Sequence, residues 1–146
     1  MVFEVASIIG HGDMLYCDVS EIKTAMLGLI ERNKCKKFLF GGMGKFDTTS
    51  AYCLWEIKKT HPHIKSCLVI PYLSFRVQDE FLYDEIIFPE ELEGAHFKKT
   101  ITLRNRYLIE HSNVAICCVL HSFGGAFQTY QYAKKRGLSL IELPKK

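Results

Sequence analysis

Short apolar runs alternate with longer amphipathic segments along the whole chain, which is the pattern of β-α-β units. The apolar runs predict strands at residues 2–9, 38–40, 64–70, 83–88, 114–120 and 138–142. The amphipathic segments predict helices at about 19–33, 47–59, 97–111 and 125–136. Strands that helices cover on both faces are continuous Val, Ile, Leu and Phe runs, as these are. The pattern predicts an α/β fold, a Rossmann-like three-layer α/β/α sandwich with a mainly parallel sheet.

Residues at the segment boundaries mark where the helices begin and end. Asp18 or Ser20 can cap the first helix, and Asp47 is most simply the N-cap of the second. Gly137 is placed to end the last helix, because glycine readily adopts the left-handed conformation found there. The chain has no repeat, low-complexity segment or linker, so we expect residues 1–146 to form a single domain.

The composition is that of a soluble globular protein, with 48% hydrophobic and 24% charged residues. The net charge is only +3, and Lys145 and Lys146 supply much of it. A tight basic cluster of Lys34, Lys36 and Lys37 is explained by a solvated helix end about as well as by a nucleic-acid patch. Because the charge is low and no strip of basic and aromatic residues is evident, we do not expect a nucleic-acid partner.

We expect a cytoplasmic protein without a metal or a cofactor. The N-terminus has an acid and no basic flank, which indicates a first strand and not a signal peptide. Residues 114–133 carry no charge, but polar residues and glycines interrupt them, so no transmembrane segment is predicted. The six cysteines include no C-x-x-C pair and fit a reducing compartment. His61 and His63 lack carboxylate support for a metal.

Three glycine clusters follow predicted strands directly, at residues 10–12, 41–44 and 124–125. Parallel strands place their carboxyl ends at one edge of a sheet, where ligands of such folds bind. A double glycine at the start of a helix lets backbone N–H groups approach an anion. Any one cluster could serve only as a tight turn, but the three together favour a phosphorylated ligand such as a nucleotide.

Several side chains are candidates to complete this site. Arg104 could clamp a phosphate, and Asn105 lies on the stripe of its helix that faces the protein; a surface arginine beside a structural asparagine is the alternative. Asp47 could accept from a ribose hydroxyl instead of capping a helix. His11 could contact a phosphate or a ring, and either Tyr130 or Tyr132 could stack on a base or pack in the core.

The order of several motifs resembles the SLOG superfamily, and most closely its small bacterial and prophage-type members. These motifs are G-G-M-G-K-F-D, V-I-P-Y, Y-D-E-I-I-F-P, R-N-R-Y and G-G-A-x-x-T-x-x-Y-A, which together cover nearly the whole chain. The resemblance implies a Rossmann-like domain that binds nucleotides or their derivatives. Relatives in this superfamily include the lonely-guy phosphoribohydrolases, which cut the N-glycosidic bond of nucleoside monophosphates, and DNA-processing proteins that bind single strands.

The catalytic half of the phosphoribohydrolase pattern is incomplete in this chain. Arg104 and the Gly124-Gly125 pair match that pattern, whereas Asn105 replaces a lysine. Gln131 stands where the resemblance places a catalytic glutamate, and a neutral amide cannot act as a base. Asp47 or Glu56 would have to supply the carboxylate. The function is therefore expected to be binding of a nucleotide or nucleotide derivative, as a sensor or sequestering module.

Two alternatives remain, a nucleotide N-glycosidic-bond hydrolase or transferase and a protein associated with single-stranded nucleic acid. We expect a homodimer and no membrane partner. We expect one pocket at the carboxyl-terminal edge of the sheet, with these ligand-binding residues: Gly10, His11, Gly41, Gly42, Gly44, Asp47, Arg104, Asn105, Gly124, Gly125, Thr129 and Gln131.

Overall fold

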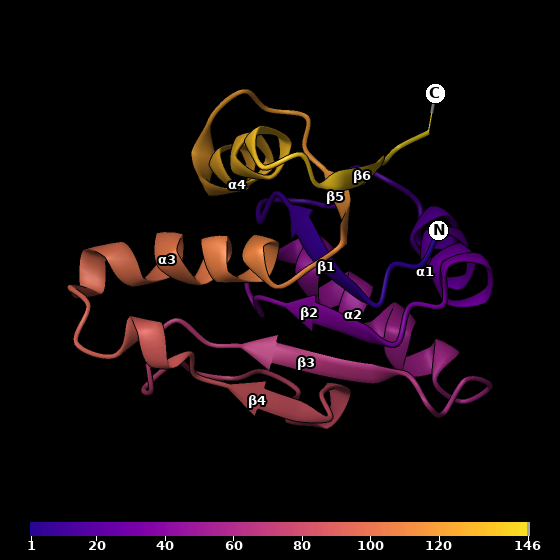
Figure 1. The fold of residues 1–146 in the computed structure, drawn as a ribbon, viewed down its shortest axis with the longest axis horizontal. Helices are drawn as coiled ribbons and strands as arrows, with labels where there is room; N and C mark the ends of the chain where they lie inside the picture. The colour runs from indigo at the N-terminus through magenta and orange to yellow at the C-terminus, as the bar shows by residue number, and fades with distance from the viewer. Residues whose placement is uncertain (146) are drawn as a thin grey trace.

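The computed structural model describes residues 1–145 and contains a six-stranded sheet in the order β4-β3-β2-β1-β5-β6 (Figure 1). Every neighbouring pair of strands runs parallel. The strands are β1 (Val5–Gly10), β2 (Lys37–Phe40), β3 (Lys65–Val69), β4 (Glu85–Ile87), β5 (Val114–Cys118) and β6 (Ser139–Glu142). The helices are α1 (Val19–Asn33), α2 (Lys45–Ile57), α3 (Phe97–Glu110) and α4 (Gly124–Lys135), with short 3-10 turns η1 (Glu80–Leu82) and η2 (Glu90–Leu92). The predicted α/β, Rossmann-like fold with a mainly parallel sheet is confirmed.

The helices cover the sheet in two pairs. Helix α1 packs on α2, and α3 packs on α4. Figure 1 shows α3 and α4 together on one side of the sheet and α1 and α2 on the other. Strand β5 serves both layers, because its side chains alternate between faces. Cys118 belongs to the core under α1 and α2, whereas Cys117 packs with Ile109 of α3 and Ala133 of α4. These neighbouring cysteines therefore face opposite sides of the sheet.

The strand order reverses direction beside β1. Strands β2, β3 and β4 extend from one side of β1, while β5 and β6 extend from the other. The loops that follow β1 and β5 therefore separate at a topological switch point, which is where open α/β sheets offer a crevice for ligands.

The helix boundaries hold one correction to the sequence analysis. Helix α2 begins at Lys45 with Gly44 as its N-cap, so the prediction that Asp47 caps this helix is wrong. Of the two predicted caps of α1, Asp18 and Ser20, Asp18 is the N-cap, and its N–H donates to Glu21 Oε1 at 3.1 Å. Within residues 1–145, no helix combines the length and the apolar character needed to cross a membrane.

Candidate functional site

A cavity of about 540 Å³ lies at the carboxyl-terminal edge of the sheet. Its walls are the loops after β1, β2 and β5, one side of α3 and the first turns of α4. The structure brings most of the predicted site residues into this lining, namely Gly10, His11, Gly41, Gly44, Asp47, Arg104, Asn105, Gly124, Gly125 and Thr129. Gly42 and Gln131 do not line the cavity, and Gln131 is exposed. That the lining residues bind a ligand stays a prediction.

Two of the glycine clusters are glycine-rich because the backbone is crowded there. A Cβ on Gly44, whose φ is +92°, would lie only 2.4 Å from the Cα of Gly12. A Cβ on Gly10 would lie 2.2 Å from the ring of Phe46. Contact between the loops after β1 and β2, and packing of α2 on β1, therefore account for these glycines without a ligand.

Gly41 is held by a charged side chain on each side of its backbone. Its N–H donates to Asp47 Oδ2 at 3.0 Å, and its carbonyl accepts from Arg104 Nη1 at 2.6 Å. The second oxygen of Asp47 accepts from the N–H of Gly42 at 3.0 Å. Asp47 thus fixes the loop after β2 and does not present an unbonded oxygen pair to the cavity.

Burial raises the pKa of the Asp47 carboxyl to about 6, although its hydrogen bonds with Gly41 and Gly42 and the nearby Arg104 favour the ionised form. Desolvation is the larger effect, since the side chain has little contact with water.

Arg104 is a buried anchor between α3 and the ends of two strands. Only 2% of it is exposed, and Nη1 donates to the carbonyl oxygens of Gly41 and Val69 at 2.6 and 2.8 Å. Nε donates to Asn105 Oδ1 at 2.9 Å, and Nη2 contacts Met43 Sδ at 3.3 Å. Asn105 is half-buried and lines the cavity, so it faces the protein as expected, whereas the alternative of a surface arginine is wrong. The arginine is the more buried of the two, because its guanidinium pairs with backbone carbonyls that would otherwise be unpaired.

His11 fastens the loop after β1 to the loop after β5. The ring is buried, and Nε2 accepts from the N–H groups of Leu120 and His121, both at 2.9 Å. Nε2 can accept only when unprotonated, so the neutral ring carries its proton on Nδ1. Burial lowers the pKa of His11, the neighbouring His121 lowers it further, and Asp13 acts in the opposite direction.

A polar and aromatic cluster beside His11 was missed by the sequence analysis. Asp13, His121 and Phe123 line the cavity, and Tyr16 stands next to them. The Tyr16 hydroxyl donates to Asp13 Oδ2 at 2.7 Å and lies 3.0 Å from His121 Nε2. The rings of His121 and Phe123 stack with centroids 5.1 Å apart. The rule that ligands gather beyond strand ends could have included Asp13 and His121, because both follow predicted strands closely.

Helix α4 begins in the cavity without a side-chain cap. Phe123 occupies its N-cap position and makes no capping hydrogen bond, and the first turn holds no acidic residue. Gly124 has a φ of +91°, which explains why it is glycine, whereas a Cβ on Gly125 would meet no atom within 4 Å. Packing of the described residues therefore leaves open space where a side chain of residue 125 would lie.

The side chains of Thr129 and Glu56 are bonded to other groups of the protein. Thr129 Oγ1 donates to the carbonyl of Gly125 within its own helix at 2.8 Å. Glu56, offered as a substitute carboxylate, is exposed and pairs with Lys23 at 3.3 Å outside the cavity lining. In the described part of the chain, no three His, Cys, Asp or Glu side chains are grouped to hold a metal ion.

The chain is similar to a small number of known proteins, and no family model matches it. It is 29% identical to an uncharacterized SPbeta prophage-derived protein of Bacillus subtilis (strain 168), YoqJ, over 79% of this chain and 81% of that protein.

Two solved structures share the fold. DNA processing protein A (DprA) from Streptococcus pneumoniae matches with a TM-score of 0.69 and 17% identity, over 99% of this chain and 51% of that one. DNA processing protein A from Helicobacter pylori, described for its single-stranded DNA binding mode, matches with a TM-score of 0.67 and 18% identity. That match covers 97% of this chain and 66% of the other, so this chain spans only part of both proteins.

Proposed function

We propose that this chain is a SLOG-type domain that binds a nucleotide or nucleotide-derived ligand in the cavity, as a sensor or sequestering module. The observation that carries the proposal is the uncapped start of α4, whose first residues, Gly124, Gly125 and Ala126, line the cavity. Backbone donors at a helix N-terminus favour a phosphate through hydrogen bonds and the helix dipole. The cavity volume of about 540 Å³ is in the range of small-molecule sites.

Of the two helices that begin at this cavity, α4 is the better phosphate site. The first turn of α2 contains Asp47, whose ionised carboxylate would repel an anion, whereas the first turn of α4 has no acid. Open space at Gly125 would let a phosphate approach the backbone closely. Arg104 can add one donor, the second N–H of Nη2, because its other four N–H groups donate to Asn105, Gly41, Val69 and Met43.

The proposal is tested by filling the open space at Gly125. Gly125→Leu introduces a side chain that meets no protein atom at its Cβ, so the fold should persist. We expect the variant to lose the thermal stabilisation that nucleoside monophosphates give the unmodified protein. A ligand at 100 times its dissociation constant adds about 2.7 kcal/mol of apparent stability.

Gln128→Leu is the matched control, because Gln128 lies on the same helix, is exposed and does not line the cavity. Equal stabilisation of both variants by nucleotides would refute a phosphate site at the start of α4. No stabilisation of the unmodified protein by any nucleotide would refute nucleotide binding itself.

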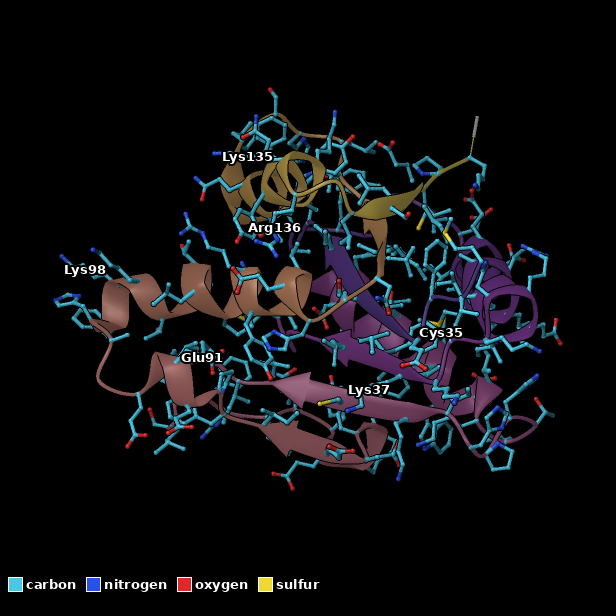
Figure 2. The ribbon with its side chains drawn as sticks, in the orientation of Figure 1. Cys35, Lys37, Glu91, Lys98, Lys135 and Arg136 are labelled. Atoms are coloured by element: carbon cyan, nitrogen blue, oxygen red, sulfur yellow. The ribbon has the colours of Figure 1, made fainter. Side chains whose placement is uncertain are left out.

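Single-stranded nucleic acid is a second candidate ligand. Likeness in fold to a protein with a described single-stranded DNA binding mode weighs against our expectation of no nucleic-acid partner. Helices α3 and α4, which flank the cavity, also carry basic side chains outside it. Figure 2 shows Lys98 at the start of α3, Lys135 at the end of α4 and Arg136 directly after it. Arg106 and Arg136 approach the Tyr132 ring, at 5.3 and 5.7 Å from its centroid.

Fluorescence anisotropy with a labelled oligothymidine separates this candidate from a free nucleotide. Nucleic-acid binding predicts a dissociation constant that rises steeply with salt concentration. It also predicts that the double variant Arg106→Gln/Arg136→Gln binds the oligonucleotide more weakly than the unmodified protein. A nucleotide module predicts no oligonucleotide binding at physiological salt.

Hydrolysis of a nucleotide glycosidic bond is the remaining alternative. The residue that stands in the glutamate position, Gln131, is exposed and outside the cavity lining, and the Asp47 oxygens accept from backbone N–H groups. We therefore propose binding without rapid release of the base. Chromatography of nucleoside monophosphates incubated with the protein tests this, and release of free base would make Asp13 the first carboxylate to mutate.

We further propose that the chain acts in the cytoplasm as a homodimer. All six cysteines are free, as a reducing compartment would leave them. Light scattering after size-exclusion chromatography gives the oligomeric state, and a monomer at all concentrations would contradict the dimer.

A further inference from the structure

The cluster of Asp13, Tyr16, His121 and Phe123 lies beside the start of α4, and the phosphate site proposed above does not use it. Asp13 belongs to the loop after β1, and His121 and Phe123 belong to the loop after β5. All three line the same cavity as Gly124 and Gly125. A nucleotide whose phosphate binds at α4 would have to place the rest of its structure within this cavity.

Phe123 offers a flat apolar surface next to the phosphate site. Phe123 is 69% exposed, and because His121 stacks on one face of its ring at an angle of 12°, a base would stack on the other face. His121 is itself held, since its Nε2 lies 3.0 Å from the Tyr16 hydroxyl and its ring contacts His11 at 4.4 Å between centroids. Phe123 precedes Gly125 by two residues, a span of about 7 Å at most. That span suits the separation of base and phosphate within one nucleotide, so a base could stack on Phe123.

Asp13 places a fixed acceptor at the same wall. Its Oδ2 accepts from the Tyr16 hydroxyl at 2.7 Å and lies 3.5 Å from His121 Nε2. The side chain is 59% exposed, so the carboxylate keeps free surface toward the cavity. The hydrogen bond from Tyr16 lowers the pKa of Asp13, which keeps it ionised near neutral pH.

An ionised carboxylate accepts hydrogen bonds and donates none, so it distinguishes among bases. Guanine presents two adjacent donors on one edge, the ring N1–H and the N2 amino group. Adenine presents an unprotonated N1 at the corresponding position, and its lone pair would oppose the carboxylate. Hypoxanthine keeps the N1–H and lacks the amino group.

We propose that Asp13, positioned by Tyr16, and the Phe123 ring form a base subsite that selects guanine nucleotides. This inference rests on the proposed nucleotide-binding function and adds the class of base to it. Asp13 contacts the guanine edge, Phe123 stacks on the base, and Tyr16 acts as a positioning residue.

Calorimetric titration with GMP, IMP, AMP and ribose 5-phosphate tests the inference on the full chain. We expect the unmodified protein to bind GMP about tenfold more tightly than AMP, with IMP between them. Asp13→Asn should bring GMP and AMP to within about threefold of each other. Phe123→Ala should weaken every nucleotide by about tenfold and leave ribose 5-phosphate unchanged. Both side chains are exposed, so thermal melts of the ligand-free variants should match that of the unmodified protein.

The other outcomes each identify what fails. Equal binding of GMP and AMP, or tighter binding of AMP, overturns the guanine subsite while nucleotide binding stands. A loss of ribose 5-phosphate in Asp13→Asn that equals the loss of GMP also overturns it, because Asp13 would then contact the sugar. If the unmodified protein binds neither ribose 5-phosphate nor any nucleotide, the proposed function fails and this inference fails with it.

Discussion

Replacing Arg104 by alanine should destabilise the folded protein more than it affects any ligand directly. The guanidinium is buried, and its two shortest hydrogen bonds go to the carbonyl oxygens of Gly41 and Val69, at 2.6 and 2.8 Å. Alanine would leave both carbonyls unpaired and would leave the buried Asp47 without its nearest favourable charge. Removing one member of a buried charged network typically costs about 3–5 kcal/mol.

The magnitude can be measured by urea unfolding, with the fluorescence of Trp55, the single tryptophan, and far-UV circular dichroism as probes. Since folded domains are stable by only about 5–15 kcal/mol, Arg104→Ala should lower the melting temperature by about 10–20 °C. Arg104→Lys keeps the charge but cannot form both carbonyl hydrogen bonds with the same fork, so it should fall between alanine and arginine.

Arg106→Ala is the matched control, because Arg106 is exposed on the same helix and approaches the Tyr132 ring, at 5.3 Å. It should change stability by less than about 1 kcal/mol. If Arg104→Ala is as stable as Arg106→Ala yet loses nucleotide affinity, the anchoring role is refuted. Arg104 would then be the phosphate clamp that the sequence first indicated.

Three further changes test the loops around the cavity. Gly44→Ala should lower the free energy of unfolding by more than about 2 kcal/mol in a urea titration, because φ is +92° and a Cβ would lie 2.4 Å from Gly12 Cα; an unchanged midpoint would contradict the crowding. The pKa of His11 is lowered from its ordinary 6.5, so its contribution is complete above that value and is lost as the pH falls through the folded pKa. Unfolding measured from pH 7 to 5 should show this loss, and His11→Gln should flatten it. Asp47 acts with the opposite sign, because its pKa is raised to about 6, so its contribution to the stability of the protein falls as the pH rises from 3.8 to 6. If His11→Gln leaves the pH dependence of the unfolding free energy unchanged, His11 is not responsible for it. Gln131→Glu should alter neither nucleotide binding nor base release, since Gln131 is exposed outside the cavity. Faster base release by this variant would show that residue 131 does occupy the position of the catalytic glutamate.

The fold and the place of the cavity could be predicted from the sequence because both follow from the periodicity of the chain. Continuous apolar runs such as Val114–Cys118 fix parallel buried strands, and glycines directly after such runs mark the edge where loops converge. Both patterns lie along the chain, so they can be recognised from the sequence alone.

The roles of individual side chains could not be predicted in the same way, because they depend on partners far away in the sequence. Arg104 is separated by 63 residues from Gly41, whose carbonyl it binds, and His11 by 109 residues from Leu120. Helical periodicity predicted that Asn105 faces the protein, but it did not predict that Arg104 is the more deeply buried residue, with its guanidinium bonded to two strand-end carbonyls. The resemblance that placed a glutamate equivalent at Gln131 likewise carried no information on how α4 is oriented.

The hydrogen bonds of His11 have a consequence for the thermodynamics of recognition. Two loops from opposite sides of the switch point are joined by hydrogen bonds of the protein itself, because the N–H groups of Leu120 and His121 both donate to His11 Nε2. A ligand that enters does not have to bring these loops together, so it avoids the loss of chain entropy that loop closure would impose. Affinity should then depend on direct contacts and little on temperature-sensitive ordering. Disconnecting the loops at His11 should weaken a ligand that never touches the imidazole.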